Sequence, residues 1–165
     1  MVAHNIPPVY DENSEILILG SFPSVKSREA AFFYGHPQNR FWRVIAAVYG
    51  DDPGSTPETK KAFLLRNHIA LWDVIGQCEI VGSADATIKN VVPNDLTAIL
   101  SAANIKAIFV NGSTAAKYYR KFQLPATGRE AITLPSTSPA NAAKRLDDLI
   151  AVWDHTISAV RSNHP

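Results

Sequence analysis

The stretch Glu15-Ile16-Leu17-Ile18-Leu19-Gly20 is a short apolar run that ends in a glycine. An apolar run of this length, bounded by a turn residue, is typical of a strand that is buried on both faces of a sheet. Three further stretches of similar character lie at residues 69–75, 106–112 and 131–134. The sequence therefore predicts four strands.

Helical patterns lie between these strands. Asn39 precedes an apolar-rich segment that Gly50 would end, and Thr56-Pro57-Glu58 places proline at a first helical position. Three later helices are predicted to begin at Asn94, at Ser113 and at Ser138-Pro139. Because strands alternate with helices, we expect an α/β fold, a three-layer αβα sandwich around a short four-stranded parallel sheet. Residues 76–92 are predicted to form a long loop, a feature that is often functional.

Length and composition indicate one globular domain over residues 1–165, with 46% hydrophobic and 19% charged residues. The formal net charge of +1 excludes a strongly polycationic nucleic-acid coat protein but permits a local basic face. Cys78 is the single cysteine, so an internal disulfide, a cysteine-based zinc site and an iron–sulfur cluster are excluded. We expect no membrane span, no secretory signal, no metal and no cofactor.

Four segments follow the predicted strands and are candidates for a binding site, because ligands of open α/β sheets bind beyond the carboxyl ends of the strands. They are Gly20–Ser24, Asp73, Asn111–Ser113 and Pro135–Pro139. Pro23 fixes the backbone of the first segment, which either directs N–H groups at a ligand or is only a tight strand exit. The hydroxyl-rich fourth segment suits a phosphate oxygen, or it forms a rigid capped turn.

A second kind of signal is the block Tyr34-Gly35-His36-Pro37-Gln38-Asn39-Arg40-Phe41-Trp42. Asparagine is a preferred helix cap, so Asn39 has an ordinary structural interpretation, and Phe41 and Trp42 are natural core residues. His36 has no second histidine or carboxylate at a metal-ligand spacing. A metal site is therefore not expected in this block.

Together these motifs resemble the uracil-DNA glycosylase superfamily, and most of all its hypoxanthine (deoxyinosine) DNA glycosylase branch, often called family 6. The Tyr34–Trp42 block is similar to the aromatic residue and His-Pro-x-Asn-Arg-Phe-Trp motif of the mismatch-specific branch. Gly20–Ser24 stands where that branch has Gly-Ile-Asn-Pro-Gly, and Phe22 occupies the position of its catalytic asparagine. The hypoxanthine branch also lacks a polar residue there and uses the asparagine of the His-Pro-x-Asn block, which is Asn39.

The resemblance implies that Asn39 is catalytic. Its neutral amide either accepts a hydrogen bond from water and holds it below the sugar C1′, or donates one to the base, and we favour water positioning. Tyr34 is expected to stack on the flipped base, a contact worth about 1–3 kcal/mol. Asp73 and Asn111 belong to the base-binding set unless they only cap turns. The full expected base-binding set is Ser21, Phe22, Pro23, Ser24, Tyr34, Asp73 and Asn111.

The resemblance also assigns the DNA backbone to the loop after the fourth strand. Ser138 occupies the position of the family's large wedge residue, so Ser136 and Ser138 are expected to bind phosphates instead. The expected contacts of this loop are Pro135, Ser136, Thr137, Ser138, Lys144 and Arg145. A basic face around the site is expected from Lys26, Arg28, Arg40, Arg43, Lys144 and Arg145, each of which is otherwise a solvated surface charge.

The implied function is DNA repair by a monofunctional glycosylase that flips out a deaminated base and hydrolyses its N-glycosidic bond, most simply hypoxanthine from deoxyinosine. The alternatives are a mismatch-specific uracil DNA glycosylase, or a non-catalytic binder of damaged DNA or of a nucleotide, which Phe22 would favour. The matched motifs contain no lysine, so no Schiff-base lyase step is expected. We expect a monomer that binds double-stranded DNA, in a cytoplasm of the bacterial type.

Overall fold

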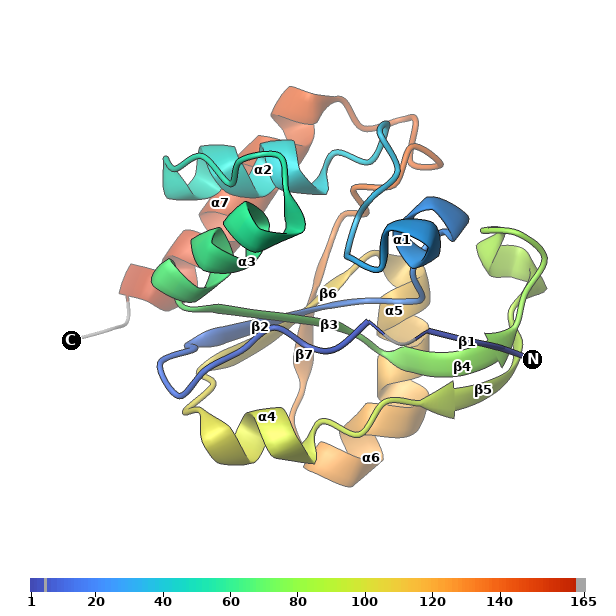
Figure 1. Ribbon diagram of the computed structural model, residues 1–165. Helices are drawn as coiled ribbons and strands as arrows, with labels where there is room; N and C mark the ends of the chain where they lie inside the picture. The colour runs from blue at the N-terminus through green and yellow to red at the C-terminus, as the bar shows by residue number, and fades with distance from the viewer. Residues whose placement is uncertain (5, 163–165) are drawn as a thin grey trace.

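The protein is built on a parallel sheet of four strands in the order β3-β2-β6-β7 (Figure 1). The computed structural model describes residues 1–4 and 6–162. Every neighbouring pair in this sheet is parallel, and the four strands are those predicted from the sequence. Their bounds are β2 (Ile16–Gly20), β3 (Ile69–Asp73), β6 (Ala107–Asn111) and β7 (Ala131–Leu134).

The alternating side chains of β2 divide the core between the two faces of the sheet. Ile16 and Ile18 belong to one buried cluster, and Leu17 and Leu19 belong to the other. Helices α2 (Phe41–Tyr49), α3 (Pro57–Arg66) and α7 (Leu146–Ser162) cover the first face. The opposite face carries α4 (Thr97–Ala102), α5 (Ser113–Tyr118) and α6 (Leu124–Thr127). The predicted three-layer αβα sandwich is therefore confirmed (Figure 1).

Local signals fix the ends of several helices as the sequence predicts. Gly50 ends α2 in the left-handed conformation, with φ of 59°. Thr56 caps α3 in a capping box with Thr59. A further short helix, α1 (Val25–Ala30), was not predicted, and the side chain of Ser24 caps it by accepting the N–H of Ser27 at 3.1 Å.

The predicted long loop over residues 76–92 is wrong. The structure has an antiparallel sheet of β1 (Val2–Ala3), β4 (Ile75–Glu79) and β5 (Lys89–Pro93), with a short 3₁₀ helix, η1 (Asp85–Thr87), between β4 and β5. Strand β5 is largely exposed, and β4 is fully buried only at Ile75 and Cys78. These strands therefore lack the continuous apolar runs by which the parallel strands are recognised.

The predicted start of the last helix at Ser138-Pro139 is also wrong, because α7 begins at Leu146. The backbone carbonyls of the intervening loop are bonded by side chains and not by a helix ladder. The Arg40 guanidinium donates to the carbonyls of Thr137, Ser138, Asn141 and Lys144. Helix α4 likewise begins at Thr97 rather than at Asn94. After α5 the chain continues through a π-helical turn, η2 (Tyr119–Gln123), into α6.

Candidate active site

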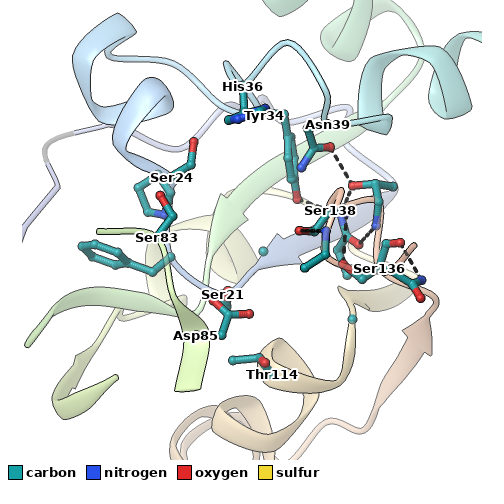
Figure 2. A pocket seen from close by; sticks show the side chains of 18 of the residues that line it. Ser21, Ser24, Tyr34, His36, Asn39, Ser83, Asp85, Thr114, Ser136 and Ser138 are labelled. Atoms are coloured by element: carbon teal, nitrogen blue, oxygen red, sulfur yellow. Dashed lines mark hydrogen bonds between the residues drawn. The ribbon is translucent and has the colours of Figure 1, made fainter. Parts of the chain in front are cut away.

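A cavity of about 720 Å³ opens at the carboxyl edge of the parallel sheet. The last residues of all four strands line it, namely Gly20, Asp73, Asn111 and Leu134. The strand order reverses beside β2, and ligands of open α/β sheets bind at such a point. The four segments that the sequence singled out therefore meet at one cavity (Figure 2).

Most of the expected site residues line this cavity. They are Ser21, Phe22, Pro23, Ser24, Tyr34, Asn39, Asp73, Asn111, Pro135, Ser136, Thr137 and Ser138. Lys144 and Arg145 do not line it and lie exposed just before α7. Sequence reasoning missed Ser83 and Asp85, which reach the cavity from the connection between β4 and β5, and Thr114 at the start of α5. Only the expectation that residues 76–92 carry function pointed toward the first two.

Tyr34 forms one wall of the cavity and is held in an unusual conformation. Its φ is 53°, a left-handed value that a bulky residue rarely adopts and that is frequent at functional sites. Its ring stacks on Phe41, with centroids 4.1 Å apart and planes 13° apart. Its hydroxyl accepts a hydrogen bond from Asn111 Nδ2 at 3.1 Å, and burial raises the pKa of the phenol well above its usual value. The ring is thus rigidly placed as a neutral aromatic surface.

Asn39 lies at the same cavity, two residues before α2. The expected N-cap role of Asn39 is wrong, because the N-cap of α2 is Arg40 and has no side-chain cap bond. Asn39 lies one residue earlier, and its Oδ1 accepts the N–H of Phe41, the first residue of the helix, at 2.9 Å. The same oxygen accepts the hydroxyl of Thr137 at 2.9 Å. Figure 2 shows the amide beside Tyr34 with its oxygen turned toward the 135–141 loop. Asn39 therefore joins a helix start to a loop that is far away in the sequence.

Gly20 ends β2 where no side chain would fit. A Cβ atom there would lie 2.5 Å from Asp73 Oδ1 and 3.0 Å from the Tyr34 hydroxyl. The missing side chain lets Asp73 and Tyr34 approach each other at the floor of the cavity. Gly20 is thus required by close packing at the site and not by a special backbone angle.

Asp73 is buried at the end of β3, and its Oδ2 atom has no hydrogen-bond partner among the residues that the structure describes. Burial raises the pKa of this carboxyl to about 7. His4 Nε2 lies 3.7 Å from Oδ2 but donates to the carbonyl of Ile75 at 2.9 Å, while Nδ1 accepts the N–H of Ile6. Burial also lowers the pKa of His4, so the imidazole is neutral and the contact is not an ion pair at neutral pH.

The raised pKa of Asp73 predicts a stability that falls as pH rises. The native state binds a proton that the unfolded carboxyl has released between pH 3.8 and about 7, so the free energy of unfolding decreases across that range. We expect Asp73→Asn to remove this decrease, and to exceed the wild type at pH 8 by more than about 1.4 kcal/mol, the equivalent of one pKa unit. Urea unfolding of both proteins from pH 4 to 8 measures it, and parallel curves would refute the assignment.

Among the described residues, those that line the cavity include no lysine or arginine. Arg40 donates to carbonyls of the 137–144 loop, and Arg28 donates to the carbonyls of Pro23 and Gly82, so both guanidinium groups of the expected basic face also make contacts within the protein. The exposed members of that predicted face are Lys26, Arg43, Lys144 and Arg145. The cations that could meet phosphates therefore lie outside the cavity lining, whose acidic residues are Asp73 and Asp85.

Ser136 and Ser138 shape the loop as well as line the cavity. Ser136 Oγ accepts the N–H of Ser138 at 3.1 Å, and Ser138 Oγ accepts the N–H of Ala140 at 3.2 Å. Each hydroxyl keeps its own proton for another acceptor. Both side chains are therefore still able to donate to an anionic oxygen at the cavity rim.

The fold and the site define a doubly wound α/β protein with a rigid aromatic surface and an amide at the carboxyl edge of its sheet. The uracil DNA glycosylase superfamily model matches residues 7–156. Two curated relatives named hypoxanthine DNA glycosylase are similar to the chain, one from Methanosarcina barkeri and one from Methanosarcina acetivorans. They are 38% identical over 86% of this chain and 89% of the relative, and 37% identical over 94% and 100%, respectively.

A solved structure supports the same relationship. The solution NMR structure of a Methanosarcina acetivorans protein, provisionally named a uracil DNA glycosylase, superposes with a TM-score of 0.77 at 36% identity. The match covers 94% of this chain and 98% of that one. The chain belongs to the uracil DNA glycosylase superfamily, as its motifs predict.

Residues 1–4 and 6–162 lack two features. No group of three or more histidine, cysteine, aspartate and glutamate side chains there is arranged to hold a metal ion. None of the helices in this part of the chain combines the length and the apolar character needed to cross a bilayer.

Proposed function

We propose that this protein is a monofunctional DNA glycosylase that releases hypoxanthine from deoxyinosine in double-stranded DNA, acting through residues 1–165 as one domain. The observation that carries the proposal is that the Asn39 amide and the Tyr34 ring line the same cavity. The amide is held by Thr137 and the ring is stacked on Phe41. The names of its relatives support the choice of hypoxanthine among the deaminated bases.

The reaction to be catalysed is hydrolysis of the bond between C1′ and N9. The bond breaks with its electron pair leaving on the base, which takes up a proton, and the oxygen of water bonds to C1′ after losing a proton. The transition state is positive at the sugar and increasingly negative on the base, so fixed polar groups supply most of the catalysis. Asn39, Asp73 and the hydroxyls of the cavity are among the polar groups that could take this role.

The base must leave the stack before it reaches the cavity, which costs a few kcal/mol. One face of the Tyr34 ring is covered by Phe41, and the residue lines the cavity. Stacking of the flipped base on this ring would return about 1–3 kcal/mol. A cavity whose described lining residues include no lysine or arginine suits a neutral purine, whereas phosphates are left to Ser136, Ser138 and the exposed cations outside the lining.

The direct test is alkaline cleavage of duplexes that contain a single deoxyinosine or a single deoxyuridine. The proposed function predicts cleavage at inosine after treatment with the enzyme and alkali, and no cleavage without alkali. Cleavage only at uracil would show that uracil, and not hypoxanthine, is the base that the enzyme releases. Binding without cleavage of either duplex would identify a non-catalytic binder, the outcome that Phe22 in the first motif would favour.

We expect DNA binding to weaken steeply with salt. The affinity would come largely from exposed cations of the expected basic face, such as Lys26 and Arg43, which displace counterions from phosphates. The dissociation constant should rise at least about tenfold from about 50 to about 200 mM salt, the behaviour of a protein with a few phosphate contacts. A fluorescence anisotropy titration measures it, and an affinity that does not change with salt would contradict any DNA-binding role.

A further inference from the structure

The hydrogen bonds around Asn39 fix which of its amide atoms is available to a substrate. The N–H of Phe41 can only donate, so the Asn39 atom it meets at 2.9 Å is the carbonyl oxygen Oδ1. The Thr137 hydroxyl bonds to the same oxygen at 2.9 Å. An amide oxygen has two lone pairs, and both are used within the protein.

The direction of the Thr137 hydrogen bond is fixed by Asn111. The backbone N–H of Thr137 donates to Asn111 Oδ1 at 3.1 Å, which identifies the other amide atom of Asn111 as the donor Nδ2. Nδ2 donates to Thr137 Oγ1 at 3.0 Å and to the Tyr34 hydroxyl at 3.1 Å. Thr137 Oγ1 is thus an acceptor from Asn111, and its single proton is given to Asn39 Oδ1.

Thr137 is fully buried, with 0% of its surface exposed. Its hydroxyl is therefore not placed to bind a DNA phosphate, the contact expected from the sequence. Buried hydrogen bonds of this kind hold a side chain in one orientation more strongly than exposed ones. The remaining polar atom of the Asn39 side chain is Nδ2, and none of the described residues makes a hydrogen bond with it.

We propose that Thr137 is a positioning residue that locks the Asn39 amide as a hydrogen-bond donor, so that Asn39 contacts an acceptor atom of the flipped base and does not hold the attacking water through its oxygen. This inference rests on the proposed function and names the role of Asn39 within it. It replaces the water-positioning role that the sequence favoured. Deamination converts the exocyclic amine of adenine into the carbonyl of hypoxanthine. An Asn39 amide that is fixed as a hydrogen-bond donor therefore complements the carbonyl of hypoxanthine and is mismatched to the amine of adenine.

Asn39→Asp distinguishes the two roles because it keeps both hydrogen bonds to the inner oxygen and replaces the outer NH₂ by an acceptor. If Asn39 donates, single-turnover excision from a deoxyinosine duplex should fall at least about 100-fold, the scale for one preorganised donor. If Asn39 holds water, a carboxylate is an equal or better acceptor and excision should persist within about tenfold. Asn13→Asp, in an exposed loop, controls for the added negative charge.

The ratio of Asn39→Asp to wild-type excision across pH adds a readout that a structural defect would not give. A protonated carboxyl can donate, so the ratio should rise toward low pH if donation is the role, and toward high pH if the group accepts from water. Tyr34, His36, Asp73 and Asp85 line the same cavity in both proteins, so a contribution that they make equally to both rates divides out of the ratio. A thermal melt and a DNA-binding titration at each pH confirm that both proteins are folded.

Thr137→Val and Thr137→Ser test the positioning role. Valine removes the hydroxyl at nearly constant volume, and we expect excision to slow about tenfold with DNA affinity unchanged, the effect of losing one buried hydrogen bond. Serine restores the hydroxyl and should recover most of the rate. If the wild type releases hypoxanthine and the Asn39→Asp variant is also active, this inference alone is overturned. A wild type that excises nothing overturns the proposed function and the inference with it.

Discussion

Asn39→Ala is expected to lower the single-turnover rate of deoxyinosine excision by at least about 100-fold, the scale for removing one preorganised polar group from an active site. Phe22 leaves the first motif without a polar side chain, and Asn39 is the amide of the Tyr34–Trp42 block that lines the cavity. Truncation removes the Nδ2 donor while the Tyr34 ring keeps its stacking contact with Phe41. The loss should therefore appear in the chemical step and not in DNA affinity.

The stability of the same variant separates catalysis from a structural role at the start of α2. The free energy of unfolding should fall by about 0.5–1.5 kcal/mol, the usual net contribution of one hydrogen bond, because the N–H of Phe41 loses its acceptor. Thermal melts and anisotropy titrations on the variant, run beside the kinetics, show how much folded and DNA-bound protein is present. Near-normal excision by that folded fraction would leave Asn39 with a structural role alone and shift attention to the backbone groups of residues 21–24.

The sequence predicts the parallel sheet well because β2, β3 and β6 are apolar runs that are buried almost throughout, whereas the edge strand β7 is exposed at Ile132 and Thr133. The fully buried Leu17 and Ile18 point to opposite layers, so no polar residue interrupts the pattern. The antiparallel strands β4 and β5 escape prediction because each has an exposed face, and residues such as Gln77 and Asn90 read as loop. Serine and aspartate in their connection therefore reach the cavity without a recognisable motif.

The residues of the site were predicted more successfully than their contacts. Asn39 and Thr137 both belong to short motifs, yet their hydrogen bond joins positions 98 residues apart. Its consequence, that the Asn39 oxygen is already used, is a property of the folded protein alone. The predicted start of α7 was wrong for the same reason. Arg40 binds backbone carbonyls 97 to 104 residues further along the chain, a contact that the sequence does not reveal.

Arg40→Ala is expected to cause the largest loss of stability among the variants of this site. The Arg40 guanidinium donates to the carbonyl of Ser138 at 2.8 Å and of Asn141 at 3.1 Å, and also contacts the carbonyls of Thr137 and Lys144. Partly buried carbonyls that lose a charged donor destabilise a fold by about 1.5–3 kcal/mol for each bond. The free energy of unfolding should therefore fall by at least about 1.5–3 kcal/mol, measured by urea unfolding.

Excision should fall with Arg40→Ala as well, by at least about tenfold, because the loop that Arg40 holds carries Thr137 and through it the orientation of Asn39. Arg120→Ala is the matched control, because it removes the same charge from an exposed residue of η2 that neither lines the cavity nor belongs to the expected basic face. Arg40→Lys keeps the charge but lacks the planar fork that reaches several carbonyls, so it should resemble alanine more than the wild type. If Arg40→Lys and Arg120→Ala both release hypoxanthine at the wild-type rate while Arg40→Ala does not, the charge of Arg40 acts on DNA and its hydrogen bonds to the loop are dispensable. If Arg40→Lys fails and Arg120→Ala does not, the loop geometry is what excision requires.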